Sequence, residues 1–163
     1  MPANGRRPAR AHSGLDRRRA LTARGLSAVE IIDLARRAAA MAEGEHTHPP
    51  TTTFAGALDA MFHDLRKWPT LHPAGLAARY FPNKPLSIVP LALALATLTD
   101  SAQEAILLAT NTGGDSDSVA SIAGGIAGAR HPDSVHAEWA AAVQRVNGHD
   151  LVSVAEALTS LRR

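Results

Sequence analysis

The feature that most constrains the fold is a run of very small side chains from Ala120 to Ala129. Alanine and glycine fill most of the run, and three of its residues are glycines. Each glycine inside a helix costs roughly 1 kcal/mol relative to alanine, so this helix needs a compensating contact. Gly124 and Gly128 lie four residues apart on one helix face, where they would admit a closely packed neighbour. We therefore expect this helix to be the most buried element of the fold.

Several oxygen-bearing side chains come immediately before this helix. Gly113 and Gly114 allow a sharp turn, because glycine adopts positive φ without a Cβ clash. The stretch Asp115–Ser118 follows directly. Asp115 or Ser116 suits the N-cap position, where a short side chain accepts hydrogen bonds from the free N–H groups of the first turn. The sequence thus predicts a glycine corner with acidic groups at a helix N-terminus.

Three interpretations of this acidic corner remain open. Asp115, Asp117 and Ser118 offer hard oxygen ligands, which suit Mg²⁺, Ca²⁺ or Mn²⁺. In a purely structural interpretation, Asp115 caps the helix and Asp117 is solvated in the first turn, where the helix dipole favours negative charge. A helix N-terminus can also bind a nucleotide phosphate, although two carboxylates would repel the phosphate unless a metal ion bridged them.

Composition favours helices throughout the chain. Apolar residues make up 45% of the 163 residues, much of that alanine, and aromatic residues only 4%. This balance is typical of tightly packed helices rather than of sheets. Capping signals and apolar periodicity predict up to eight helices and no strand, hence an all-α, compact multi-helix bundle in one domain. The expected helices span about 27–42, 54–65, 73–80, 88–98 (with Pro90 in its first turn), 102–110, 116–129, 134–146 and 151–161.

Charge is unevenly distributed along the chain. The first 37 residues carry nine arginines against three acidic residues, although the net charge is only +2. We interpret residues 1–20 as a flexible, solvated arm and residues 21–163 as the helical domain. An arginine-rich arm can also bind nucleic acid, but we do not favour such a partner. The longest apolar run is too short to span a membrane. The absence of cysteine is compatible with a cytoplasmic location.

The sequence resembles a known family at the acidic corner. The segment from Asn111 to Ser118, which reads Asn-Thr-Gly-Gly-Asp-Ser-Asp-Ser, is followed by the alanine- and glycine-rich helix. Together they resemble the C-terminal signature of the ADP-ribosylglycohydrolases, a family that includes the dinitrogenase-reductase-activating glycohydrolases. The family more often has threonine where this chain has Ser118. The resemblance implies an all-α fold and metal-dependent removal of ADP-ribose from a modified protein or small molecule.

The resemblance also implies roles for individual residues. Asp115 and Asp117 would be metal-binding and catalytic carboxylates, and Ser118 would be a metal-bound hydroxyl. The family site holds two Mg²⁺ ions, for which Mn²⁺ could substitute. Asn111, Gly113 and Gly114 would contact the substrate. So would His48, because Thr47-His48 followed by proline matches a family pattern in which the histidine helps to hold ADP-ribose.

One departure from the family pattern limits these expectations. Family members also carry a Thr-Asp-Asp segment and a further acidic residue near the N-terminus, and this sequence contains no Asp-Asp pair. The resemblance, from near Ser27 onward, therefore covers only the C-terminal half of a typical member. We expect a truncated or split enzyme whose other half is supplied by a separate chain or by a longer true reading frame, and which is inactive or weak alone. The alternative is a non-catalytic remnant that keeps the helical fold and at most binds ADP-ribose or a protein partner.

Overall fold

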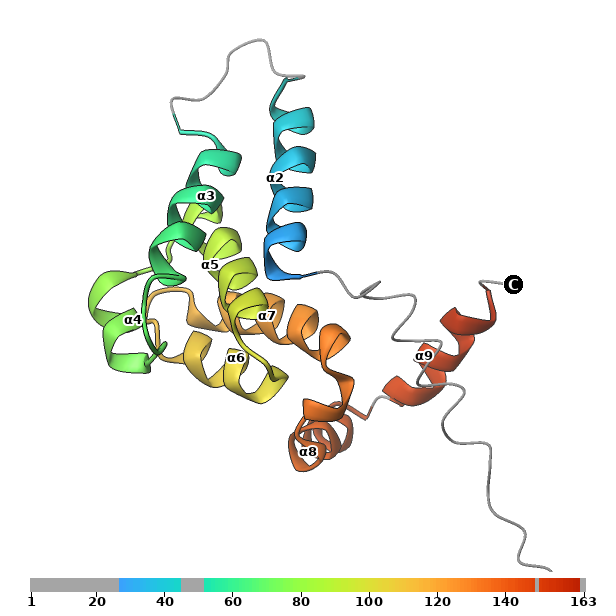
Figure 1. Cartoon of the computed structure of the whole chain (residues 1–163). Helices are drawn as coiled ribbons and strands as arrows, with labels where there is room; N and C mark the ends of the chain where they lie inside the picture. Colours follow the sequence, from blue (N-terminus) through green and yellow to red (C-terminus); the bar gives the residue numbers. More distant parts are fainter. Residues whose placement is uncertain (1–26, 45–51, 149, 162–163) are drawn as a thin grey trace, which may run out of the picture.

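The computed structural model describes residues 27–44, 52–148 and 150–161. These residues form eight α-helices and a short 3-10 helix, and no strand occurs among them, which confirms the all-α expectation (Figure 1). The elements are α2 (Ala28–Gly44), α3 (Phe54–Leu65), α4 (Pro73–Arg79), α5 (Pro85–Leu98), α6 (Ala102–Thr110), α7 (Ser116–Arg130), the 3-10 helix η1 (Pro132–Ser134), α8 (Ala137–Asn147) and α9 (Leu151–Ser160).

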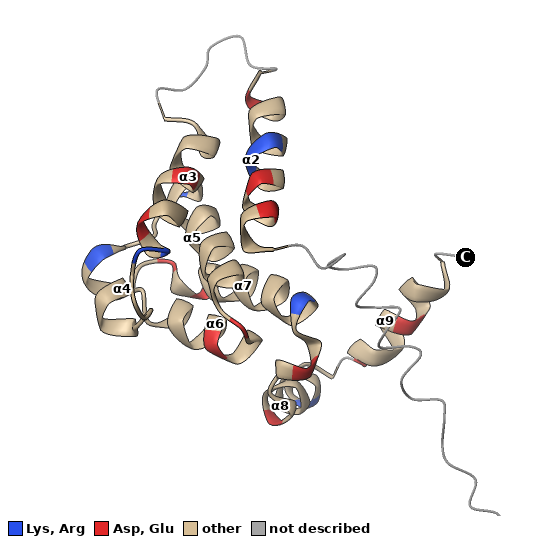
Figure 2. Cartoon of the chain, in the orientation of Figure 1, with Lys and Arg blue, Asp and Glu red and all other residues tan. Residues whose placement is uncertain are grey.

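Helix α5 lies at the centre of the bundle, where it packs against α3, α7, α2 and α6. It carries no charged residue, as Figure 2 shows, and its sides are apolar all round. Leu91, Ala92 and Leu95 are fully buried. The expectation that α7 would be the most buried helix is therefore wrong, because α5 has seven buried residues and α7 has four. The helix also begins earlier than expected, at Pro85, so Pro90 lies inside it rather than in its first turn.

Helices α6 and α7 pack closely at Gly124 of α7. A Cβ on Gly124 would lie 2.7 Å from Cγ1 of Ile106 on α6. A Cβ on Gly128 would meet Ala102 of α6 at 3.9 Å. Gly125 has nothing within 4 Å of its Cβ position, so it faces away from this contact. The predicted role is confirmed for Gly124, which lets the two helix axes approach. A Cβ on Gly128 would make only ordinary van der Waals contacts, the nearest at 3.4 Å with Val135 Cγ2, so that glycine is not required for the approach.

Most of the predicted helix starts are confirmed by their hydrogen bonds. The Ser27 N–H donates to the Glu30 carboxylate at 2.8 Å, and the Glu30 N–H donates to Ser27 Oγ at 3.3 Å, which is a capping box. Thr53 caps α3 and Ser101 caps α6, each by accepting from a backbone N–H three residues later. Asp150 caps α9 in the same way. Local side-chain chemistry thus determines where these helices begin.

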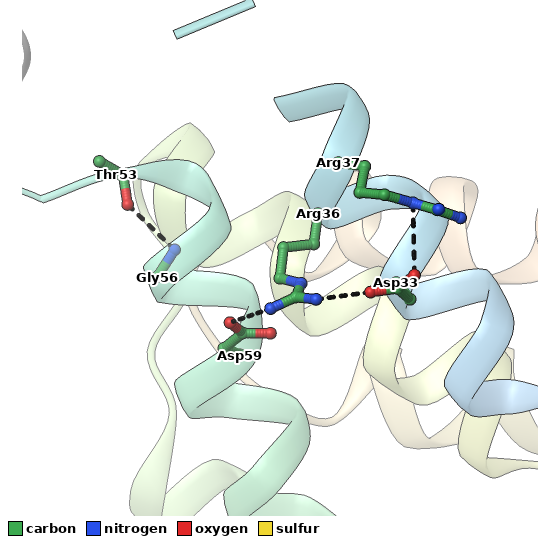
Figure 3. Close-up of polar contacts among 6 residues, drawn as sticks. All are labelled: Asp33, Arg36, Arg37, Thr53, Gly56 and Asp59. Atoms are coloured by element: carbon green, nitrogen blue, oxygen red, sulfur yellow. Dashed lines mark hydrogen bonds and ion pairs between the residues drawn. The ribbon is translucent and has the colours of Figure 1, made fainter. Parts of the chain in front are cut away.

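Helices α2 and α3 lie side by side and are joined by polar contacts at their exposed edges (Figure 3). Arg36 pairs with Asp33 on its own helix at 2.6 Å and reaches Asp59 of α3 at 3.7 Å. Exposed pairs of this kind contribute little to stability. Ile32 is the buried residue of α2, whereas the apolar side chains Val29 and Leu34 of the same helix are about half exposed.

The last two helices pack far less than the sequence predicts. Pro132–Ser134 forms η1 instead of the start of a helix, and α8 begins only at Ala137. Neither α8 nor α9 has a buried residue. Their apolar stripes remain exposed at spacings typical of a helix face that packs against a neighbour: Trp139, Val143 and Val146 on α8, and Leu151, Val154, Leu158 and Leu161 on α9. Within the described ranges, none of the helices is long and apolar enough to cross a lipid bilayer.

Candidate functional site

The predicted glycine corner connects the end of α6 to the start of α7. Asn111 is the C-cap residue of α6, and Ser116 is the first residue of α7. Between them, Gly113 and Gly114 both adopt positive φ, at 74° and 57°. A side chain is strained in this region of backbone conformation, so the double glycine is what permits the sharp turn. The corner is built as the sequence predicts.

The corner rests directly on the segment that precedes α5. The Asp115 N–H donates a hydrogen bond of 2.7 Å to the carbonyl oxygen of Pro82. A Cβ on Gly114 would lie only 2.2 Å from the same oxygen, so no other residue fits there without displacing the backbone. Phe81, which is largely exposed, would lie 3.4 Å from a Cβ on Gly113. Contacts with Phe81 and Pro82, which belong to the segment before α5, thus fix the backbone of the corner.

Asp115 occupies the N-cap position of α7, but its side chain makes no capping hydrogen bond. Its carbonyl oxygen accepts the first helical bond, from the Val119 N–H at 3.2 Å. The sequence interpretation in which the Asp115 carboxylate caps the helix is therefore wrong. Asp115 has φ −82° and ψ 55°, unlike the extended N-cap residues of α3 and α6. The half-buried Asp115 carboxylate is left available for another role.

The Asp117 carboxyl group lies at the same helix tip. The pKa of Asp117 lies below its usual value, first because of a hydrogen bond between its carboxyl group and that of Asp115, and then because of the N–H groups of Ser118 and of Asp117 itself. The two carboxyl groups therefore converge instead of pointing apart. Asp117 is exposed and Ser118 half-buried, so the tip is open to solvent.

Asn111 and Thr112, which precede the two glycines, form hydrogen bonds to the last turn of α6. The Asn111 side-chain amide donates to the Leu107 carbonyl oxygen at 2.7 Å, so its nitrogen is engaged in ending α6. Thr112 is fully buried, and its hydroxyl donates to the Ala109 carbonyl oxygen at 2.8 Å. The anchoring roles of Thr112 and Pro82 are not apparent from the sequence. Nothing in the sequence alone marks a proline carbonyl as the acceptor for a residue 33 positions later.

The chemistry of the corner suits a hard divalent cation, but its ligand set is small. Asp115, Asp117 and Ser118 offer two carboxylates and a hydroxyl, the oxygen ligands that Mg²⁺ prefers. The described part of the chain contains no group of three or more His, Asp or Glu side chains arranged to hold a metal ion. The substrate-contact prediction for His48 lies outside the described residues. The corner alone therefore fits part of a metal site.

The helical fold and the acidic corner define an all-α protein with a carboxylate pair at the tip of a small-residue helix. A sequence profile of the ADP-ribosylglycohydrolase family matches residues 10–163. The chain belongs to the ADP-ribosylglycohydrolase family, whose type of reaction is hydrolysis of an ADP-ribosyl glycosidic bond. Searches of curated proteins and of solved structures returned no match to the chain.

Proposed function

We propose that this chain takes part in Mg²⁺-dependent hydrolysis of an ADP-ribosyl glycosidic bond, which releases ADP-ribose from a modified protein or small molecule. Family membership supports the type of reaction. The observation that carries the proposal is the Asp115 side chain, which sits at an N-cap position, makes no capping bond and lies beside the carboxyl group of Asp117. A carboxylate kept out of capping in this way is free to bind a cation.

The residues of the corner have distinct proposed roles. Asp115, Asp117 and Ser118 would bind the metal through oxygen, with two Mg²⁺ ions in the complete site and Mn²⁺ as a substitute. When bound, Mg²⁺ supplies positive charge that orients the ribose and stabilises the charge developing as the glycosidic bond breaks. Gly113 and Gly114 carry no side chain and are exposed, so they let a substrate approach the backbone. Asn111 and His48 would add polar contacts to the substrate.

The complete site would need ligands from elsewhere. Mg²⁺ prefers six oxygen ligands in near-octahedral geometry and keeps some of its water. The corner supplies fewer protein ligands than a dinuclear site requires, and no further cluster of acidic or histidine side chains lies in the described residues. We propose that a Thr-Asp-Asp segment, carried by a separate chain or by a longer reading frame of this protein, supplies the remaining carboxylates.

The test combines this chain with the N-terminal half of another family member. Substrates with arginine-linked, serine-linked and acetyl-ester ADP-ribose are incubated with the mixture, and the release of ADP-ribose is measured by mass spectrometry. We expect release with Mg²⁺, no release with EDTA, and a loss of at least about a hundredfold in Asp115→Ala, as is common when a transition-state interaction is removed. Glu104→Gln is the matched control, because Glu104 is another first-turn carboxylate at the far end of α6.

The alternative function is non-catalytic binding of ADP-ribose or a protein partner. Two observations favour it: the corner holds only two carboxylates, and α8 and α9 leave their apolar stripes exposed. No release in any pairing, together with calorimetric binding of ADP-ribose by the chain alone, would favour this alternative. Release that persists in Asp115→Ala would contradict the proposed role of the corner.

A further inference from the structure

The segment between α4 and α5 is anchored at its first residue by a polar cluster. Tyr80 is extended, with φ −121° and ψ 132°, and its hydroxyl donates to Asp64 Oδ2 at 2.5 Å. Arg79 donates to both oxygens of the same carboxylate, at 2.6 and 3.1 Å. Asp64 belongs to α3, so these bonds fasten the end of α4 to a different helix. Bidentate arginine–carboxylate contacts of this kind also fix orientation.

The protonation states of Asp64 and Tyr80 in this cluster do not change near neutral pH. The hydrogen bonds from Arg79 and then from Tyr80 hold the pKa of the Asp64 carboxyl below its usual value. Burial, followed by the hydrogen bond to Asp64, raises the pKa of Tyr80 to about 12. Tyr80 therefore remains a donor and Asp64 an ionised acceptor over the whole physiological range.

The other end of the segment is fastened to the first turn of α5. The N–H groups of Asn83 and Lys84 both donate to Ser87 Oγ at 3.2 Å. The Ser87 hydroxyl in turn donates to the Lys84 carbonyl oxygen at 2.9 Å. A segment of five residues held at both ends has little freedom in its middle.

Pro82 lies in that middle and presents its carbonyl oxygen to the acidic corner. Pro82 is fully buried, and its ring restricts its own φ. Its carbonyl oxygen accepts the Asp115 N–H at 2.7 Å. The position of this oxygen therefore determines where the backbone of Asp115 lies, and with it the carboxylate that the corner offers.

We propose that Asp64 and Tyr80 are positioning residues for Asp115: they fix the segment from Tyr80 to Lys84, whose Pro82 carbonyl holds the Asp115 backbone at the tip of α7. The effect on metal binding rests on the proposed function, whereas the positioning of the backbone does not. The side-chain hydrogen bonds of Asp64 and Tyr80 join α3 to the end of α4 and do not involve the corner. Their influence passes through the backbone between Tyr80 and Pro82.

The positioning is tested by measuring amide hydrogen exchange in the full chain, with NMR as the readout. Tyr80→Phe removes only the hydroxyl, and we expect the Asp115 amide to exchange about tenfold faster, which is the effect of weakening one hydrogen bond. The His131 amide, bonded to the Ala127 carbonyl at the other end of α7, is the internal reference and should not change. Asp64→Asn should act in the same direction. Asp33→Asn, which disrupts an ion pair on α2, should leave both amides unchanged.

An unchanged Asp115 amide in Tyr80→Phe, or equal acceleration at Asp115 and His131, would overturn the proposal. A second measurement separates it from the proposed function. Mn²⁺ binding is measured by electron paramagnetic resonance on the full chain mixed with the N-terminal half of another family member, and it should weaken several-fold in Tyr80→Phe. If the unmodified chain, mixed with the N-terminal half of another family member, binds no Mn²⁺, the metal site is contradicted, and the amide exchange still decides whether Tyr80 positions Asp115.

Discussion

Gly124 of α7 faces Ile106 of α6 so closely that an added Cβ would lie 2.7 Å from Ile106 Cγ1. Its neighbour Gly125 has open space at the same position. Gly125→Ala should therefore stabilise the protein by about 1 kcal/mol, the gain in helix propensity. Gly124→Ala should be destabilising, because helix α6 or Ile106 must move. Urea unfolding, monitored by circular dichroism, gives the free energy of unfolding of each variant. Equal changes in this free energy would contradict the close packing of α6 and α7.

A second prediction concerns the two N-cap residues Asp115 and Thr53. Thr53 Oγ1 accepts a hydrogen bond from the Gly56 N–H at 3.0 Å, whereas the Asp115 side chain makes no such bond. Thr53→Ala should lower the free energy of unfolding by about 1 kcal/mol. Asp115→Ala should lower it by less than about 0.5 kcal/mol, because the side chain makes no capping bond and its neighbour Asp117 carries a like charge. A loss in Asp115→Ala as large as in Thr53→Ala would show that the carboxylate caps α7 after all.

Tyr80 is the single tyrosine of the chain, so its ionisation can be followed by absorbance at 295 nm. The pKa of Tyr80 is raised from 10.0 to about 12 in the folded protein. Its stabilising contribution is therefore complete below pH 10 and is lost as the pH rises through about 12. The folded chain should titrate near pH 12 and the urea-unfolded chain near pH 10.

Asp64→Asn should lower the folded midpoint of the Tyr80 titration, because it removes the acceptor charge beside the phenol. Asp33→Asn should not change it, since Asp33 lies on α2 and pairs with Arg36. A folded midpoint near pH 10 in the unmodified chain would contradict both the burial of Tyr80 and its bond to Asp64.

Leu58 and Leu158 offer a matched pair for testing the boundary of the core. Leu58 on α3 is 0% exposed, and Leu158 on α9 is 60% exposed. Leu58→Ala should cost about 2–5 kcal/mol because it leaves a cavity. Leu158→Ala should change the free energy of unfolding by less than about 0.5 kcal/mol. A large loss in Leu158→Ala, measured by urea unfolding of dilute protein, would show that α9 packs in solution.

Local chemistry explains which parts of the fold could be predicted. Short polar residues such as Ser27, Thr53, Ser101 and Asp150 bond within their own helix, so their caps are readable from the sequence. Periodicity indicates which face of a helix is apolar, but not whether another element covers that face. Val29 and Leu158 are therefore exposed despite their helical spacing. The small residues of α7 predicted a close neighbour, but not that α5 would be the central helix.

The residues that form the acidic corner could be predicted from the sequence, but the contacts that hold it in place could not. Gly113, Gly114 and Asp115 are consecutive, and the turn they form follows from the conformational freedom of glycine. The contact of Asp115 with Pro82 joins residues that are distant in the chain, and it depends on how α5 and α7 pack. Asp115 at the N-cap makes no capping bond, which also departs from the ordinary preference of aspartate for capping.

The exposed position of α9 has a consequence for the integrity of the chain. A helix of ten residues is marginal in water without tertiary packing, and α9 has no buried residue. Proteases cleave where the backbone can unfold locally, so trace protease should cut within Leu151–Ser160 long before it cuts α5. The resulting fragment would retain the acidic corner and the helices that support it.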